Sequence, residues 1–422
     1  MQRLLRQLIA PMVLSVGVLL CGYGLSASAA TYVPSAFPAG PQCETVWVND
    51  SEQTVGKCNS ATPSANAIPW YSSTLAGPQQ ALAPLSSRKP CEVSAISNNG
   101  GWVVGNCANA NNLFFAVLWN AATPGITPIT LAPLPARWLL LIQVRPADTQ
   151  TAPTAQNRNG AVLAVSLSAD IDATVVVYSA GSTTPQRVSD RGDNCYGVDL
   201  TETLTNGWPR ILLNCPGPSG KPVLTLATWS TGSNQYVLTP ASLPAGALDC
   251  EGVDMNDQGQ FVGTCTFPGT AADTQQTAFW STASSTPLLL TMPLNAQNHA
   301  VAINNLGHVL AYGNDPTGFQ RPLYWNDPTN SFSVQSIPPL PGSDVVQVAA
   351  FADNDTVALN CVNSSEYPTG CYWTPLLGTV PISPISGGLA SYLNAISPAG
   401  TYVVGSATGA TFNFTAVGAK LP

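Results

Sequence analysis

Cysteine residues recur in pairs at fixed places in a unit that is repeated along this chain. Cys91 and Cys107 enclose an apolar stretch, an Asn-Asn-Gly turn and a second apolar stretch. Cys250 and Cys265 enclose the same succession of features. A repeat of this length indicates a fold that stacks one supersecondary unit many times, because a single unit cannot bury its own apolar face. The repeat therefore restricts the fold far more than it restricts the function.

Residues 1–30 have the features of a secretory signal peptide. Arg3 and Arg6 provide a basic start, Leu8 to Leu20 an apolar stretch, and Ala27-Ser28-Ala29 a cleavage motif of small residues. We therefore expect export to the periplasm or the extracellular space. Residues 31–422 are expected to form a single mature domain.

The cysteines that remain after cleavage are expected to form disulfides. Cleavage removes Cys21 from the 11 cysteines, and the even number that remains suits an oxidising compartment. Zinc binding fits poorly, because the sequence has no C-x-x-C motif and only two histidines, His299 and His308. We expect no cofactor, apart from a Ca²⁺ ion considered below.

The composition excludes several classes of protein. Charged residues make up 9% of the chain and hydrophobic residues 45%, which suits turn-rich β-structure around a large core. The formal net charge is −8, and an acidic surface repels phosphate backbones, so nucleic acid is not an expected partner. No segment after the signal is long and apolar enough to insert into a membrane. We expect an exported monomer.

Eight units align on the residue that ends the second apolar stretch. Successive units lie 46 to 59 residues apart, and the longest step holds extra residues at 137–148. Each unit contains a strand, a turn such as Asn256-Asp257-Gln258-Gly259, a second strand and a third that ends in an aromatic residue. A Leu/Pro-rich run such as 337–341 is expected to form a fourth, outermost strand. The aligned residues are Cys58, Cys107, Ser166, Cys215, Cys265, Gly313, Cys361 and Ala407.

Four antiparallel strands in each unit predict an all-β, eight-bladed β-propeller, with seven blades as the alternative. A linear β-solenoid fits less well, because its repeats are usually much shorter. The last unit lacks a Leu/Pro-rich run, so we expect the segment beginning Thr31-Tyr32-Val33 to supply its missing strand and close the ring. The recurring aromatic residues are expected to pack between blades. They are Trp70, Trp119, Tyr178, Trp229, Trp280, Trp325 and Trp373.

The spacing of the cysteines predicts their pairing. Residues equidistant from a hairpin turn face each other at Cα distances that a disulfide can bridge. Four pairs have their midpoints inside the predicted first turns, and the fifth has its midpoint in a turn between the second and third strands. We therefore expect five disulfides, each within one blade. They are Cys43–Cys58, Cys91–Cys107, Cys195–Cys215, Cys250–Cys265 and Cys361–Cys371.

The repeat resembles that of the HAF-type extracellular repeat proteins of bacteria. Residues 303–310, which read Ile-Asn-Asn-Leu-Gly-His-Val-Leu, and Ala278-Phe279-Trp280 carry this likeness. Units of the type cover nearly the whole mature chain. The resemblance implies export and a repeat architecture but no particular substrate. The histidine of the family's third strand is absent, because Thr277 precedes Ala278-Phe279 and Arg321 holds the place in the sixth unit.

Propellers usually bind ligands at a mouth of the central channel, where equivalent positions of the innermost strands converge. The position after the first cysteine of each unit predicts one such ring. Three glutamates on it could bind Ca²⁺, and the ring as a whole could bind a polar ligand such as a sugar. Polar strand ends beside a solvent-filled mouth are the simpler explanation. The ring consists of Glu44, Glu92, Ala152, Tyr196, Glu251, His299, Gln347 and Tyr392.

Four tryptophans lie outside the recurring aromatic position and are better candidates for exposed contacts. Among them, Trp208 stands beside Pro209 in the lengthened turn of the fourth unit and is the first choice. The four are Trp47, Trp102, Trp138 and Trp208.

The sequence favours a non-enzymatic binding or scaffold module that recognises an extracellular glycan or protein. The polar members of the ring and Trp208 are its expected ligand-binding residues, with no catalytic and no metal-binding residue. The G-x-S-x-G elbow of a hydrolytic triad is absent. The alternative is an enzyme: a polysaccharide hydrolase or lyase, or a metal-dependent lactonase. It would use Glu44, Glu92 or Glu251 with His299 or Tyr196 as acid and base, which requires that two such groups converge.

Overall fold

The computed structural model describes most of the mature chain. The described residues are 30–34, 42–59, 67–139, 142–170, 172–217, 220–269, 273–291, 297–314, 319–330, 333–409 and 413–422. The predicted signal peptide therefore lies outside the described residues, except for Ala30. In the described part of the chain, no helix is long and apolar enough to cross a membrane.

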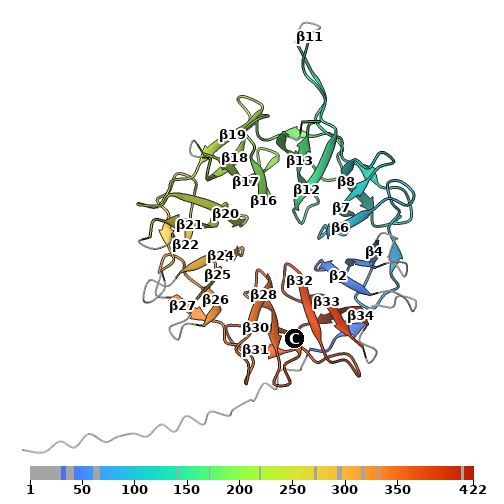
Figure 1. Ribbon diagram of the computed structural model, residues 1–422, viewed down its shortest axis with the longest axis vertical. Coiled ribbons are helices and arrows are strands. Elements are labelled where there is room, and N and C mark those ends of the chain that lie inside the picture. The colour runs from blue at the N-terminus through green and yellow to red at the C-terminus, as the bar shows by residue number, and fades with distance from the viewer. Residues whose placement is uncertain are drawn as a thin grey trace, which may run out of the picture.

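The strands form small antiparallel sheets that stand in a ring around a central opening, as in a β-propeller (Figure 1). We name each blade by its innermost strand. The β2 blade contains β2 (Cys43–Val48), β3 (Thr54–Cys58), β4 (Ile68–Ser72) and β5 (Gln80–Ala81). The β6 blade contains β6 (Cys91–Ile96), β7 (Trp102–Ala108), β8 (Phe114–Asn120) and β9 (Ile129–Thr130). The β12 blade contains β12 (Gln150–Gln156), β13 (Val162–Leu167), β14 (Ala173–Tyr178) and β15 (Gln186–Arg187).

The next two blades share one hydrogen-bonded sheet, because Val223 and Cys250 form a parallel bridge between them. The β16 blade contains β16 (Tyr196–Thr205), β17 (Trp208–Pro216), β18 (Pro222–Ser230) and β19 (Gln235–Pro240). The β20 blade contains β20 (Asp249–Met255), β21 (Phe261–Phe267), β22 (Thr274–Trp280) and β23 (Leu288–Leu289).

The remaining blades complete the ring. The β24 blade contains β24 (Asn298–Ile303), β25 (Val309–Asn314), β26 (Gln320–Trp325) and β27 (Val334–Ser336). The β28 blade contains β28 (Val346–Phe351), β29 (Val357–Val362), β30 (Pro368–Thr374) and β31 (Gly378–Pro381). The β32 blade contains β32 (Ser391–Ile396), β33 (Tyr402–Thr408) and β34 (Phe414–Lys420), and its outer strand is β1 (Val33–Pro34).

The two ends of the described chain meet in the β32 blade. Val33 pairs with Gly418 and Pro34 with Val417, in antiparallel register. Tyr32 is buried in the core of this blade together with Ile382 and Val417. The prediction that the segment beginning at Thr31 supplies the missing strand is therefore confirmed.

The predicted disulfides are confirmed in all five places, and each joins residues of one blade. The predicted aromatic position is confirmed too, because its members are all buried. Three of them also donate a hydrogen bond to a backbone carbonyl of the preceding inter-blade connection. The donors and acceptors are Trp119 to Ala83, Tyr178 to Ala132 and Trp280 to Ser242.

The prediction that the Leu/Pro-rich runs form the outermost strands is wrong. The fourth strands are short and end before these runs, as β9 ends at Thr130 and β27 at Ser336. Proline has no N–H to donate to a ladder, so the chain leaves the sheet edge there. Instead, Leu131 and Ile337 are fully buried and fasten each connection to the core.

Every innermost strand contains a β-bulge in its pairing with the second strand. The glycine of the Val-Val-Gly stretch lies beside it. A Cβ atom on Gly105 would stand 2.1 Å from the backbone oxygen of Glu92, and one on Gly405 would stand 1.9 Å from that of Tyr392. The bulge brings the strands too close for a side chain and redirects the residue that follows it.

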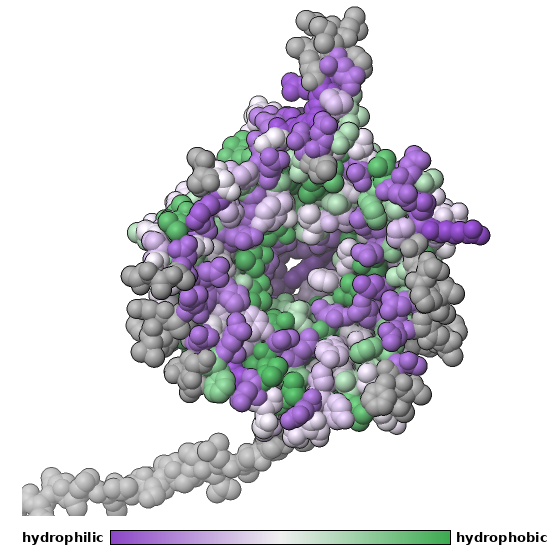
Figure 2. Space-filling model, viewed as in Figure 1, coloured by the Kyte–Doolittle hydropathy of each residue, from purple (hydrophilic) through white to green (hydrophobic). Residues whose placement is uncertain are grey.

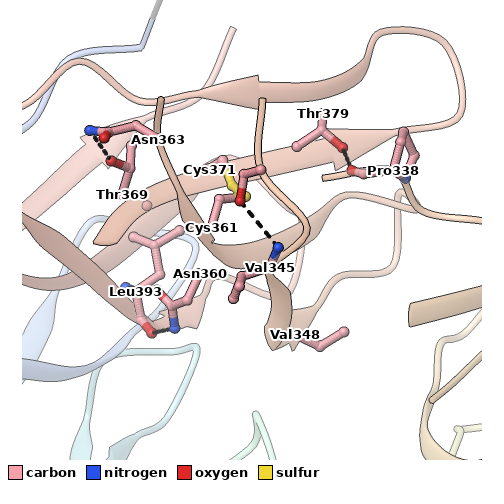
Figure 3. Close-up of a disulfide and its surroundings, with 12 residues drawn as sticks. Pro338, Val345, Val348, Asn360, Cys361, Asn363, Thr369, Cys371, Thr379 and Leu393 are labelled. Atoms are coloured by element: carbon pink, nitrogen blue, oxygen red, sulfur yellow. Dashed lines mark hydrogen bonds between the residues drawn. A yellow bond between two sulfur atoms is a disulfide. The ribbon is translucent and has the colours of Figure 1, made fainter. Parts of the chain in front are cut away.

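Hydrogen bonds fasten neighbouring blades near the channel. The carboxamide of Asn360 donates to the carbonyl of Leu393 over 2.9 Å and accepts from the Leu393 N–H over 2.7 Å, beside the Cys361–Cys371 disulfide (Figure 3). Asn214 holds Gly252 of the next blade in the same way, at 2.9 and 2.7 Å.

The turns that follow the innermost strands are linked into a closed circle. In each blade, an N–H of this turn, or of strand β16 in the case of Glu202, donates to an oxygen of the next blade, and the last blade donates to the first. We call this circle the turn belt. Its links, donor first, are Asp50 to Asn98, Asn98 to Arg158, Arg158 to Glu202, Glu202 to Asp257, Asp257 to Asn305, Asn305 to Asp353, Asp353 to Pro398, and Ala399 to Asp50.

The extra residues expected at 137–148 form a hairpin. Its strands β10 (Arg137–Leu139) and β11 (Ile142–Arg145) pair only with each other in the described chain. Figure 1 shows the hairpin projecting outward beside the β12 blade, away from the channel.

The closing strand predicts an effect on stability. A protein that begins at residue 35 should unfold with a free energy lower by about 3 kcal/mol or more than a protein that begins at residue 30, because it loses the buried Tyr32. Denaturant unfolding of the two proteins measures the difference. Equal midpoints and slopes would contradict ring closure by β1.

Candidate functional site

The innermost strands line the channel, which has one mouth at each end of these strands. We call the mouth at the beginning of these strands the strand-start mouth, and the mouth at the turn belt the turn mouth. The predicted ring lies at the strand-start mouth, where its residues occupy equivalent ladder positions. Glu44 faces Lys57, Ala152 faces Val165 and His299 faces Tyr312 in the second strands.

Three of the predicted residues gather on adjacent blades. The hydroxyl of Tyr196 donates to a carboxylate oxygen of Glu251, and His299 lines a small cavity together with Glu251. Burial raises the pKa of Tyr196 to about 12, and the Glu251 carboxylate adds to this effect. Burial also lowers the pKa of His299 below its ordinary value. These groups converge as the enzyme alternative requires, but the Tyr196 hydroxyl is a poor acid or base near pH 7.

The other members of the ring stand apart from this group. Glu44 forms an ion pair with Lys57 at 3.2 Å, and both side chains are more than a third exposed. Tyr392 packs against Phe414, and its ring lines the same cavity as Glu44. Glu92 and Gln347 are exposed, and Gln347 lines a different cavity beside His299.

Trp208 does not have the exposed position expected of it. It is half-buried in β17 and packs against Trp229 at a ring distance of 5.2 Å and against Tyr236 at 6.4 Å. The turn before it brings Trp208 back onto the aromatic cluster of its own blade, so the side chain contributes to packing.

The turn mouth holds a site that the sequence analysis missed. A cavity of about 310 Å³ lies there, within the range of about 300–1,000 Å³ that is typical of small-ligand sites. Its walls include the residue directly after the bulge of several innermost strands. This position is alanine in five blades and differs in three. Around the ring it reads Trp47, Ala95, Ala155, Asp199, Asp254, Ala302, Ala350 and Ala395.

The two aspartates stand on adjacent blades, and their carboxyl groups are hydrogen-bonded to each other. Asp199 also accepts from the N–H of Met255 at 3.3 Å, and Asp254 from the N–H of Ile303 at 2.8 Å. Burial raises the pKa of Asp199 well above its ordinary value, and the Asp254 charge raises it further. Burial raises the pKa of Asp254 to about 6. The pair therefore holds one shared proton at pH values above about 6 and below the pKa of Asp199.

A third acidic group stands beside the pair in the turn belt. Glu202 accepts hydrogen bonds from the N–H groups of Arg158 and Asn159, and its side chain is 20% exposed. Burial raises the pKa of Glu202 to about 7, against the opposing effect of these hydrogen bonds. Its protonation state therefore changes near neutral pH.

An ion pair spans the turn mouth. The guanidinium of Arg158, on the turn after β12, lies 2.5 Å from a carboxylate oxygen of Asp353, on the turn after β28. These two blades stand on opposite sides of the ring (Figure 1). Figure 2 shows the central opening in a space-filling view. The arginine thus reaches across the channel at the mouth whose cavity the aspartate pair also lines.

The acidic residues do not form a metal site in the part of the chain that the structure describes. No group of three or more His, Cys, Asp or Glu side chains there is arranged to hold a metal ion. The expectation that the strand-start glutamates bind Ca²⁺ stays a prediction.

The aspartate pair could have been found from the aligned repeats. Asp199 and Asp254 occupy a place where most units have alanine, and two polar departures in successive units form a strong signal. The predicted ring was instead built on the position next to the first cysteine. The bulge, which shifts the register before Asp199, was not anticipated.

No protein-family model and no curated protein matches this sequence. Several solved structures resemble it. One is the β-propeller domain of the Trilobed protease from Pyrococcus furiosus, with 12% identity, a TM-score of 0.48 and coverage of 77% of this chain and 93% of that one. Another is a prolyl endopeptidase, with 12% identity, a TM-score of 0.51 and coverage of 90% and 54%. A third is the acylaminoacyl peptidase of Pyrococcus horikoshii, with 9% identity, a TM-score of 0.48 and coverage of 89% and 59%.

These neighbours correct one expectation. The chain spans only 54% and 59% of the two peptidases, and at 9–12% identity the likeness concerns the β-propeller fold. The expectation of a non-enzymatic binding or scaffold module is contradicted, because the prolyl endopeptidase is an enzyme that contains this fold. The choice of reaction rests on the channel residues.

The raised pKa values predict how stability depends on pH. Glu202, Asp199 and Asp254 bind protons more tightly in the folded than in the unfolded chain, where carboxyl pKa values are about 4. The free energy of unfolding should therefore fall as pH rises from about 4 through about 7. The double variant D199A/D254A, which restores the alanine of the other blades, should fold and show a shallower decline. Urea unfolding between pH 4.5 and 8 measures both slopes, and equal slopes would contradict the shared-proton assignment.

Proposed function

We propose that this chain is an exported, disulfide-linked, eight-bladed propeller that hydrolyses an acyl bond, an amide or ester, with Asp199 and Asp254 as its catalytic pair. The eight links of the turn belt support the blade number, and the five disulfides fit an oxidising compartment outside the cytoplasm. Membership of the HAF-type repeat group and a monomeric state remain part of the proposal. The single observation that carries the function is the hydrogen-bonded carboxyl pair at a position that is otherwise alanine.

The close pairing selects the reaction class. Enzymes that cleave glycosidic bonds hold their two carboxyl groups about 5 Å or more apart, so that a sugar or a water fits between them. Asp199 and Asp254 share a hydrogen bond instead. Two carboxyl groups that share one proton are the arrangement of aspartic proteases, which activate a water molecule between them. The geometry therefore favours acyl-bond hydrolysis over the polysaccharide hydrolase or lyase considered from the sequence.

The two aspartates would divide the proton transfers. Asp254, with the lower pKa, is the carboxylate that accepts a proton from a water molecule while the water oxygen attacks the carbonyl carbon. Asp199 carries the proton and donates it to the leaving nitrogen or oxygen as the acyl bond breaks. The products are a carboxylic acid and an amine or alcohol. The pair again holds one proton, which returns across the hydrogen bond.

Arg158 and Glu202 would control access to this pair. A substrate must pass the Arg158–Asp353 ion pair, which spans the turn mouth. Glu202 lies beside Arg158, with 4.0 Å between the guanidinium and a carboxylate oxygen. Loss of the Glu202 charge below pH 7 would weaken its hold on the Arg158 turn.

A substrate screen tests the proposed activity. Mature oxidised protein is incubated with labelled peptide, ester, lactone and oligosaccharide libraries, and the products are identified by mass spectrometry. We expect cleavage of amide or ester bonds, with kcat/KM lower by about 10²- to 10⁴-fold in D199N and D254N.

The control is E251Q, at the strand-start mouth, which should retain the wild-type rate. Cleavage that depends on Glu251 and not on Asp199 would move the active site to the other mouth. Cleavage of oligosaccharides alone would contradict the acyl-bond assignment.

A further inference from the structure

Arg158 is the only cation among the described residues that line the turn-mouth cavity. Five carboxyl groups line the same cavity, namely Asp199, Glu202, Asp254, Asp257 and Asp353. Burial is the main cause of the raised pKa of Glu202, and the Asp257 charge adds to it. The Asp353 charge adds in the same way to the effect of burial on the pKa of Asp254. Negative charge on the cavity walls therefore opposes the formation of a further anion inside it.

Hydrolysis of an acyl bond forms such an anion. When water attacks the carbonyl carbon, one electron pair of the C=O bond moves onto the carbonyl oxygen, which becomes an oxyanion. In the proposed reaction, Asp254 accepts the water proton and Asp199 keeps its own proton for the leaving group. The N–H groups of Met255 and Ile303 already donate to these two aspartates. The oxyanion therefore needs a further donor, and the cavity walls offer one cation.

The contacts of Arg158 hold its guanidinium across the mouth and leave it accessible. Its Nη2 lies 2.5 Å from a carboxylate oxygen of Asp353, and its Nε lies 4.0 Å from one of Glu202. Asp353 is itself fixed, because it accepts hydrogen bonds from the N–H and the carboxamide of Asn305 at 3.0 and 3.2 Å. A guanidinium has five N–H donors, so the ion pair leaves donors for a second acceptor. The Arg158 side chain is 34% exposed, so a ligand in the cavity can meet them.

We infer that Arg158 is a third catalytic residue, which donates hydrogen bonds to the carbonyl oxygen of the substrate and stabilises the oxyanion. Asp353 is a positioning residue, which holds the guanidinium across the channel. As Asp254 takes the proton of the attacking water, its negative charge passes to the carbonyl oxygen beside the guanidinium. The electron pair then re-forms the C=O bond, the bond to the leaving nitrogen or oxygen breaks, and that atom takes the proton of Asp199. This inference rests on the proposed acyl-bond hydrolysis and adds a residue to it.

Substitutions of Arg158 and Asp353 test these roles on the amide or ester substrate that the screen identifies. R158Q removes the charge and should lower kcat about 10²- to 10³-fold, as the loss of an oxyanion donor does, with little change in KM. R158K keeps the charge but not the planar set of donors, so its kcat should fall less. D353N loosens the guanidinium without removing it, so its kcat should lie between those of R158Q and the wild type.

Chemical rescue separates a catalytic guanidinium from a structural one. Guanidinium ions at millimolar concentration should raise the kcat of R158A by about tenfold or more, whereas urea, a neutral molecule of similar shape, should not. R210A is the matched control. Arg210 donates to the Asp257 carbonyl of the turn belt at 2.9 Å but does not line the cavity. R210A should therefore lower the free energy of unfolding, keep kcat near that of the wild type and show no rescue.

The possible outcomes distinguish this inference from the proposed function. An unchanged kcat in R158Q, or a loss in R158A that guanidinium does not rescue, would overturn the oxyanion role. If cleavage still depended on Asp199 and Asp254, the hydrolase would stand. A higher kcat/KM in R158Q would show that Arg158 only obstructs the mouth, which would also overturn the role. Absence of cleavage, or cleavage that D199N and D254N leave unchanged, would overturn the proposed function and this inference with it.

Discussion

The turn belt is the interaction on which the channel depends. Each turn contributes one N–H donor and one oxygen acceptor, so the hydrogen bonds are saturated only when the last blade meets the first. The Ala399 N–H completes the circle on the Asp50 carboxylate over 2.7 Å. An open arc would leave one donor and one acceptor without a partner at its ends. The belt and the β1–β34 pairing therefore support each other, because both require the same two blades to be adjacent.

The belt also determines the chemistry of its mouth. The acceptor is a backbone carbonyl in two links and a polar side chain in the other six, among them the carboxylates of Asp257 and Asp353. These charges gather around the opening and are partly offset by Arg158, which reaches across it. An acidic rim makes it harder to ionise the carboxyl groups just below it, and burial has the same effect on Asp199 and Asp254. The interaction that closes the ring thus helps to keep a proton on the aspartate pair.

The parts of this fold that were predictable are those encoded by local spacing. Cysteines such as Cys250 and Cys265 stand at equal distances from a turn, so their pairing follows from hairpin geometry. The length of the units predicted the ring, and the missing strand in the last unit predicted that the segment with Val33 closes it. The predictions that failed concern features that depend on contacts between units. The proline of a Leu/Pro-rich run suggested that the run forms the edge strand of a sheet. Burial of the Leu131 side chain in the core determines where the run lies instead. The aspartate pair was missed for the same reason, because Asp199 and Asp254 lie more than one repeat apart in sequence and meet only through the bulge.

In a propeller built from one repeat, functional residues can be recognised because they differ from the residue at the same position in the other blades. The backbone is nearly the same in each blade, and the residue after the bulge faces the following blade in both β16 and β20, as the contacts of Asp199 with Met255 and of Asp254 with Ile303 show. A single aspartate at this position would meet only a backbone N–H. A second aspartate in the next blade stands where the first one points, and the two must share a proton. Adjacency in the repeat thus creates the pair, and an aspartate two blades away could not replace either member.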